Sequence, residues 1–386
     1  MRVVVAVDAF KGCLSSADAG EAVAAGVRAA APDAQVRVVP VADGGEGTVD
    51  ALLAGAGVSR VREAVRVVDA VGRPVDAGYA LLDGGSTAVV EAASCVGLGQ
   101  VDVGPDLPPR AGSAGLGLLV RHAVDRGARR VVVALGGTAC TDGGIGLLVA
   151  LGARVRDDAG DPVAAPDPNP LWRFGSLDAL PDLRGVELVV LTDVDSPLHG
   201  PAGAAHVFGP QKGATPEQVA HLDGRLAAWG AALAAHGRPV ADRPGAGAAG
   251  GLGAALLALG AEREAGFGYV ARAVGLAGAV AGADLVLTGE GRVDAQTARG
   301  KTPVGVAALG RAAGAVVVAL AGAVDLAADD APGPFDAVLP VHPRPLPLAE
   351  ALDPATTAAH LAGAAAQVTR LVAAARRPLA PGSGPQ

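Results

Sequence analysis

The chain has 386 residues, a net charge of −8 and 51% hydrophobic residues, of which few are aromatic. This length exceeds what one ordinary core organises, so we expect two domains. The acidic balance and the lack of a Lys/Arg-rich run argue against partners that need a basic face, such as nucleic acids and anionic membranes. Small anionic substrates stay open, because a site needs only a few local cations.

Cysteine usage and hydropathy bear on the compartment. Cys13, Cys95 and Cys140 show no zinc-like spacing and no disulfide framework, which is typical of a reducing environment. The first apolar run ends at Asp8 and is too short for a signal peptide. No run reaches the ~18 apolar residues of a membrane span. We therefore expect a cytoplasmic monomer or homodimer that acts on a small molecule.

Short Val- and Leu-rich runs alternate with Ala-rich stretches along the chain. The runs predict strands at residues 3–7, 36–41, 88–90, 131–135, 188–192, 285–287 and 316–320. The stretches between them predict helices at residues 17–30, 116–125, 216–235 and 302–313, and Ser15 or Ser16 is expected to cap the first helix. Continuous apolar runs are typical of strands buried on both faces of a parallel sheet. The alternation predicts an α/β fold.

Acidic residues and glycines follow almost every predicted strand. In chain order they are Asp8 and Lys11, Asp43 to Glu46, Glu91, Gly136 to Thr138 with Asp142, Asp193 with Asp195, and Glu290 with Arg292 and Asp294. A single acid at such a place usually caps a helix or a turn. Because ligands of parallel sheets bind outside the carboxyl ends of the strands, the recurrence predicts a site.

These residue types suit phosphoryl transfer. The reaction needs backbone amides around phosphates, Mg²⁺ held by one or two carboxylates, a cation on the migrating group and a base near the accepting hydroxyl. Glycine-rich loops that open helices present such amides. Candidate loops lie at residues 136–144, 245–253 and 289–302.

Other functions find weaker support. Residues 245–250 match G-x-G-x-x-G, but the preceding Ala-Asp-Arg-Pro is a poor strand for a dinucleotide site. Gly300-Lys301-Thr302 resembles the end of a P-loop, yet Ala295 stands where its first glycine is needed. The histidines show no zinc-like spacing, and no nucleophile elbow occurs.

Several long segments resemble the bacterial glycerate kinase family of type I, the glycerate 2-kinases. They include VPVADGGEGTVDALL, ALGGTACTDGGIGLLVALGA, the GPQKGA turn and ADLVLTGEGRVDAQTARGKTPVGVA, and they run in the family's order over nearly the whole chain to about Gly322. The resemblance implies an ATP-dependent phosphotransferase with an alcohol acceptor, D-glycerate as substrate, Mg²⁺ as cofactor and 2-phosphoglycerate as product.

The resemblance also implies two α/β domains. One is flavodoxin-like (Rossmann-like) and is expected to combine residues 1–72 with 284–386. The other, of mixed restriction-enzyme-like topology, is expected at residues 73–283, and residues 378–386 are expected to form a disordered tail.

Site residues follow from the matched motifs and the strand ends. Catalytic roles are expected for Asp43, Asp193, Lys11 and Arg292, with Asp43 or Asp193 orienting the hydroxyl. Substrate contacts are expected from Asp8, Lys11, Glu46, Ser113, Glu290, Arg292 and Lys301. Nucleotide contacts are expected from Gly136, Gly137, Thr138, Lys212, Gly245, Gly247 and Gly250, and Mg²⁺ ligands from Asp142, Asp193 and Asp195.

The sequence departs from the family pattern at three places. Ala9 stands where the family has a serine, Thr141 replaces an amide, and only Ser113 remains of a Thr-Ser stretch. These changes leave two other hypotheses open: a kinase of another small hydroxy acid, and a ligand-binding relative without catalysis. Turnover across a panel of hydroxy acids would separate them.

Overall fold

The computed structural model describes residues 1–55, 61–294, 302–325 and 333–376. The chain is an α/β protein and divides into two compact units. The first comprises Met1–Asp43, Asp50–Ala56 and Val270–Gln386, and the second comprises Gly44–Val49 and Gly57–Tyr269. These bounds differ from the expected ones, because β3 (Val61–Val68) pairs with β4 (Pro74–Leu82) in the sheet of the second unit.

The first unit is built on a parallel five-stranded sheet in the order β2-β1-β11-β12-β13. Its strands are β1 (Arg2–Val7), β2 (Gln35–Val38), β11 (Leu285–Asp294), β12 (Val316–Asp325) and β13 (Ala337–Pro340). Numbered within the unit, this is the flavodoxin-like order 2-1-3-4-5, whose ligand site lies between the first and third strands. Here those neighbours are β1 and β11.

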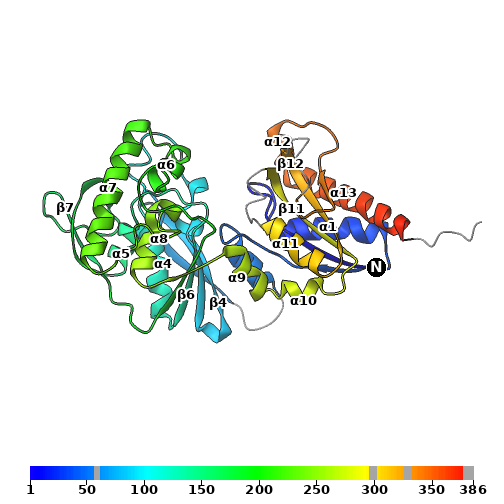
Figure 1. Cartoon of the computed structure of the whole chain (residues 1–386), viewed down its shortest axis with the longest axis horizontal. Helices are drawn as coiled ribbons and strands as arrows, with labels where there is room; N and C mark the ends of the chain where they lie inside the picture. Colours follow the sequence, from blue (N-terminus) through cyan, green and yellow to red (C-terminus); the bar gives the residue numbers. More distant parts are fainter. Residues whose placement is uncertain (56–60, 295–301, 326–332, 377–386) are drawn as a thin grey trace, which may run out of the picture. The chain divides into compact units, whose positions relative to one another are not determined.

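Helices cover both faces of this sheet (Figure 1). Helices α1 (Ser16–Ala30) and α13 (Pro354–Ala375) pack on the face that carries Val5, Leu287 and Leu320. Helix α11 (Thr302–Ala312) packs on the opposite face, where Gly310 approaches Val286 and Val317. The Ser15 side chain accepts a hydrogen bond from the amide of Asp18 and caps α1, as expected.

Helices α1 and α13 touch at backbone level. A Cβ atom on Gly26 would lie 2.0 Å from the carbonyl oxygen of Ala362, so only glycine permits this approach. The shorter helices of the chain that involve the first unit are α2 (Thr48–Ala54), α9 (Gly266–Ala273), α10 (Leu276–Val280) and α12 (Leu348–Ala351).

The second unit has a mixed six-stranded sheet in the order β10-β9-β6-β5-β4-β3. Strands β5 (Thr87–Glu91), β6 (Arg130–Ala134), β9 (Glu187–Leu191) and β10 (Glu262–Glu264) are parallel, and β3 and β4 form an antiparallel extension. A hairpin joins β7 (Arg154–Asp157) and β8 (Phe174–Ala179). The helices are α3 (Ala93–Val96), α4 (Ala114–Asp125), α5 (Ile145–Ala150), α6 (Ala204–Phe208), α7 (Pro216–Ala235) and α8 (Ala248–Ala258).

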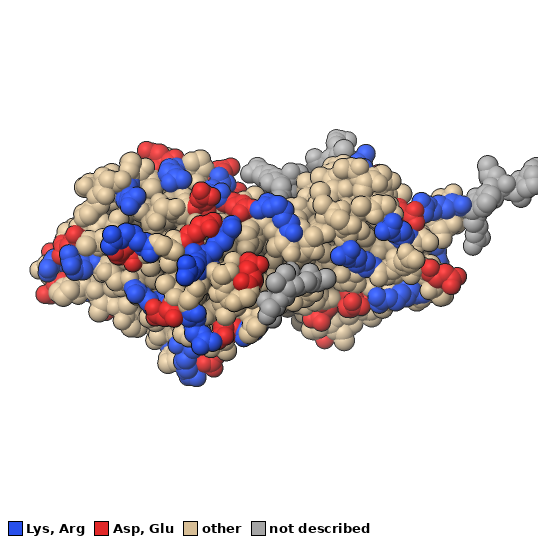
Figure 2. Space-filling view, turned by 90° about the horizontal axis from the view of Figure 1, so that it is seen from below, with Lys and Arg blue, Asp and Glu red and all other residues tan. Residues whose placement is uncertain are grey.

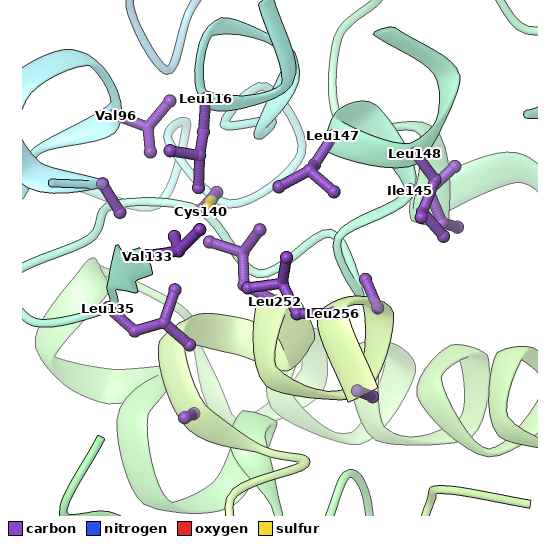
Figure 3. Packing of buried hydrophobic residues seen from close by; sticks show 14 of the residues in the cluster. Val96, Leu116, Val133, Leu135, Cys140, Ile145, Leu147, Leu148, Leu252 and Leu256 are labelled. Atoms are coloured by element: carbon purple, nitrogen blue, oxygen red, sulfur yellow. The ribbon is translucent and has the colours of Figure 1, made fainter. Parts of the chain in front are cut away.

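The core of the second unit surrounds the segment that follows β6. Cys140 lies among Leu116 of α4, Val133 of β6 and Leu252 of α8 (Figure 3). Burial raises the pKa of the Cys95 thiol to about 12 and also raises that of Cys140, so both behave as small apolar side chains. Apolar packing thus anchors the glycine-rich loop at residues 136–144.

All seven predicted strands and all four predicted helices are present. One expectation about residues 289–302 is wrong in part: β11 continues to Asp294, so Glu290 and Arg292 belong to a strand and not to a loop. Among the described helices, none combines the length and apolarity needed to cross a membrane. On the face drawn in Figure 2, basic and acidic side chains are interspersed.

Candidate active site

A pocket of about 440 Å³ lies at the carboxyl ends of the strands of the first unit. It spans the junction between β1 and β11, where ligands of this strand order bind. Five residues expected to act in the site line it, namely Asp8, Lys11, Asp43, Glu290 and Arg292. Segments distant in sequence therefore converge here, because each follows or ends a parallel strand.

Opposite charges meet in this pocket. The Lys11 ammonium lies 3.6 Å from the Asp43 carboxylate, and the Lys11 side chain is 61% exposed. Arg292 contacts the Asp325 carboxylate and lies 3.7 Å from that of Asp294. Both cations have carboxylate partners and both side chains are 61% exposed, so each is accessible to an anionic ligand that replaces a carboxylate.

Asp8 is a buried acid at the end of β1. It is 5% exposed, and its carboxylate accepts a hydrogen bond of 2.7 Å from the Ala9 amide. Burial and the nearby Asp43 carboxylate raise the pKa of Asp8 to about 7, against the opposing effects of the Ala9 amide and Lys11. A carboxyl group with this pKa can give up or accept a proton near neutrality.

The pocket also contains residues that the sequence analysis missed. His342, which follows β13, lines it, as do Leu348, Ala351 and Leu352 at helix α12. The sequence pattern contains no sign of His342, because the strand before it, β13, is short and half-exposed and lacks the continuous apolar run by which the other strands were predicted. The pocket therefore has one charged wall and one apolar wall.

The second unit presents backbone amides at the end of β6. Within the described residues, the amides of Gly136, Gly137 and Thr138 donate no hydrogen bond. Gly137 has a φ of 75° and is exposed. Successive unpaired amides in a left-handed turn form an anion-binding concavity, so this tripeptide, here called the amide cradle, is suited to a phosphate.

Lys212 lies behind the amide cradle and not in solvent. It is 4% exposed, and its ammonium donates to the Cys140 carbonyl at 2.6 Å and to the Thr138 hydroxyl at 3.5 Å. Burial lowers the pKa of Lys212, while the nearby Cys140 and Asp142 groups oppose that shift. These contacts support the loop from inside the unit, and the expected direct nucleotide contact of Lys212 stays a prediction.

The second glycine-rich loop packs against the first. The Gly143 amide donates to the Gly250 carbonyl at 3.0 Å, and the Gly247 amide donates to the Ser196 carbonyl at 2.9 Å. A Cβ atom on Gly250, which has a φ of 70°, would lie 2.2 Å from the Cys140 carbonyl oxygen. Gly247 and Gly250 thus serve loop packing, and Gly245, with a φ of 88°, turns the chain beside Arg263.

Ser113 and Asp142 form an internal network. The Asp142 carboxylate accepts from the Ser113 amide and hydroxyl and from the amides of Gly144 and Gly146, at 2.7–3.1 Å. Both side chains are fully buried, and the Ser113 hydroxyl also accepts from the Leu147 amide. Ser113 and Asp142 therefore satisfy one another inside the unit, and the expected substrate contact of Ser113 and metal contact of Asp142 stay predictions.

The remaining expected residues have other partners or settings. Asp195 forms an ion pair of 2.7 Å with Arg263. Asp193, at the end of β9, accepts a hydrogen bond of 3.2 Å from the Gly266 amide. Glu46 is exposed within the Gly44–Val49 segment of the second unit. Lys301 lies outside the described residues.

Comparison with known proteins identifies the family. The model of the glycerate kinase family matches residues 3–373. The chain belongs to the glycerate kinase family. The chain is 41% identical to a glycerate kinase of Bacillus subtilis, over 92% of this chain and 93% of that protein. It is 38% identical to a glycerate 2-kinase of Escherichia coli, over 84% and 86% of the two chains.

A solved structure shows the same fold as this glycerate kinase family member. It is a crystal structure assigned to a glycerate kinase 2 from Salmonella typhimurium LT2, with a TM-score of 0.80 and 37% identity. The similarity covers 97% of this chain and 99% of the other. The α/β architecture inferred from the sequence is thereby confirmed.

A kinase of this family is expected to use a magnesium nucleotide. Within the described ranges, no three His, Cys, Asp or Glu side chains are grouped to hold a metal ion. Magnesium needs only one or two carboxylates when phosphate oxygens and water complete its shell. Asp193, which follows the parallel strand β9 of the second unit, is a carboxylate that could serve as such a single protein ligand.

The internal role of Asp142 gives a prediction for this glycerate kinase family member. Asp142→Ala leaves a hydroxyl and three amides unsatisfied in the core, so we expect a loss of about 3–5 kcal/mol in the free energy of unfolding. Urea unfolding measures it, and the loss is expected to be equal with Mg²⁺ and with EDTA. A loss seen only with Mg²⁺ would support the expected metal role.

Proposed function

We propose that this member of the glycerate kinase family transfers the γ-phosphate of ATP to a hydroxyl of D-glycerate, and that glycerate binds in the pocket of the first unit. One observation carries the proposal: an accessible lysine and several carboxylates converge at the β1/β11 junction of a flavodoxin-like sheet. Family membership supplies the reaction class, and the pocket supplies groups for an acid that carries hydroxyls.

In this proposal, Lys11 binds the glycerate carboxylate. Its ammonium is an accessible cation of the pocket, and its pairing with Asp43 holds it at the β1 end. Arg292 adds a second cation once it releases a carboxylate, and a guanidinium can bind a carboxylate through two parallel hydrogen bonds. Glu290, which also lines the pocket, is available to accept hydrogen bonds from the glycerate hydroxyls.

The proton of the attacking hydroxyl is taken by the Asp8–Asp43 pair. As the hydroxyl oxygen bonds to the γ-phosphorus, the bond from phosphorus to the ADP oxygen breaks and the proton passes to a carboxylate. Asp43 is the accessible member, and Asp8, with a pKa of about 7, can share the proton. Because the transition state is loose, positioning and charge contribute more than the base.

The nucleotide is proposed to bind the second unit. The N–H groups of the amide cradle donate to phosphate oxygens, and Lys212 supports the cradle from within. Asp193 would hold Mg²⁺, which neutralises phosphate charge when bound.

The cytoplasmic location stays a prediction from the cysteine usage.

Product analysis tests the proposal. Incubation with D-glycerate, ATP and Mg²⁺ is expected to give 2-phosphoglycerate, identified by ³¹P and ¹³C NMR. Release of ADP with no phosphorylated acid, or no turnover at all, would refute it.

A second acceptor deserves the same assay, because the pocket of about 440 Å³ falls within the size range of sites for ligands larger than a three-carbon acid. A panel of longer hydroxy acids, assayed for coupled ADP release, would show whether glycerate has the highest kcat/KM.

A further inference from the structure

Two histidines meet at the edge of the pocket in the first unit. The Nδ1 atoms of His342 and His360 lie 2.9 Å apart, and the rings meet edge to face at 78°. His342 lines the pocket and follows β13, whereas His360 belongs to α13. His360 therefore fixes the ring of His342 from the side away from the ligand.

The short distance between the two Nδ1 atoms limits the charge of this histidine pair. Two Nδ1 atoms at hydrogen-bond distance share one hydrogen, because two N–H groups cannot point at each other. The pair thus carries at most one positive charge. When it carries that charge, both Nε2 atoms bear hydrogens, and His342 has an N–H donor on its edge away from His360.

The surrounding charges decide which state prevails. Burial and His360 lower the pKa of His342, while Glu350 of α12 opposes that shift; Glu350 itself pairs with Arg344 at 2.9 Å. The ionisable groups that line the pocket beside His342 are Asp8, Lys11, Cys13, Asp43, Glu290, Arg292 and Asp294. Carboxylates thus outnumber cations there, so an entering carboxylate benefits from one more positive group.

We propose that His342, oriented by His360, is a further substrate-binding residue that donates from Nε2 to the carboxylate of the acid substrate, and that the pair takes up a proton when the acid binds. This rests on the proposed placement of glycerate in the same pocket. The affinity for the acid is then highest while the pair is charged and falls as rising pH removes the charge.

The test compares His342→Gln and His360→Gln with wild type from pH 5.5 to 8.5. In wild type, KM for glycerate is expected to rise about 3–10-fold over this range, in keeping with the loss of one charge-assisted hydrogen bond. Both variants are expected to raise KM for glycerate at pH 5.5 and to reduce its pH dependence to the part that comes from Asp8, with KM for ATP unchanged. His236→Gln, on the second unit, is the matched control.

Calorimetry gives a readout independent of turnover. Glycerate titrated into wild type in buffers of different ionisation enthalpy is expected to show net proton uptake. The uptake is expected to be smaller in both variants, in which Asp8, with a pKa of about 7, is the remaining group that can gain a proton. The proposal would be overturned if wild type turns over glycerate and both variants show the same KM profile and the same proton uptake as wild type. Wild type that neither binds nor phosphorylates glycerate would instead overturn the proposed function. If His342→Gln does not fold, the result for His360→Gln decides the test, because His360 is not among the residues that line the pocket.

Discussion

Asp43→Asn is expected to lower kcat for glycerate phosphorylation by about 10²–10⁴-fold, the range contributed by a positioned general base. The side-chain amide of the asparagine cannot accept the proton of the attacking hydroxyl. The variant also lacks the negative charge of Asp43, which lies 3.6 Å from the Lys11 ammonium. Coupled ADP release at saturating ATP and glycerate measures the effect. KM for ATP is expected to change little, since the nucleotide is proposed to bind the second unit.

A matched control separates this effect from a general loss of charge. Asp76 of β4 is 73% exposed and pairs with Arg66 at 3.3 Å on the second unit. Exposed pairs of this kind contribute little to stability, so Asp76→Asn is expected to keep wild-type kcat. A folded Asp43→Asn enzyme with normal kcat would remove Asp43 from the mechanism.

Asp8→Asn is expected to lower kcat and, at alkaline pH, to stabilise the fold. In the native state the pKa of Asp8 is about 7, above the ordinary value of 3.8. As pH rises from about 4 to 7, the unfolded chain has already lost this proton while the native chain retains it, so stability falls. At about 1.4 kcal/mol per unit, the shift of roughly three units amounts to up to about 4 kcal/mol above pH 7. The asparagine variant lacks this decline.

Urea unfolding at pH 4.5 and pH 8 measures that difference. The variant is expected to gain stability over wild type at pH 8 and little at pH 4.5. Asp33→Asn, at an exposed position in the same unit, is the control and is expected to follow wild type at both values. A variant with the same pH dependence as wild type would show that Asp8 ionises normally.

The strand ends were predictable from the sequence because burial on both faces leaves a continuous apolar run. Val3 to Val7 and Leu285 to Leu287 mark the neighbouring strands β1 and β11, so Asp8 and Glu290 could be placed at one edge of a sheet. The edge strand β13 lacks this signal, since its side chains are half-buried or exposed. His342 was missed for that reason.

Burial of polar groups was not predictable in the same way. Asp142 and Ser113 have the residue types and the setting of a ligand site, and only the packing of α4 against α5 shows that they bond to each other. Lys212 likewise resembled a phosphate contact, yet its ammonium is directed to the Cys140 carbonyl inside the unit. Sequence patterns give the residue type and the spacing, whereas the partner of a buried charge depends on tertiary structure.

The location of the acid substrate is tested most directly by a crystal structure of the protein soaked with D-glycerate. The account predicts density for the acid in the pocket of the first unit, with its carboxylate within hydrogen-bond distance of the Lys11 ammonium and a hydroxyl beside Asp43. Glycerate bound only to the second unit, with this pocket empty at saturating concentration, would contradict it.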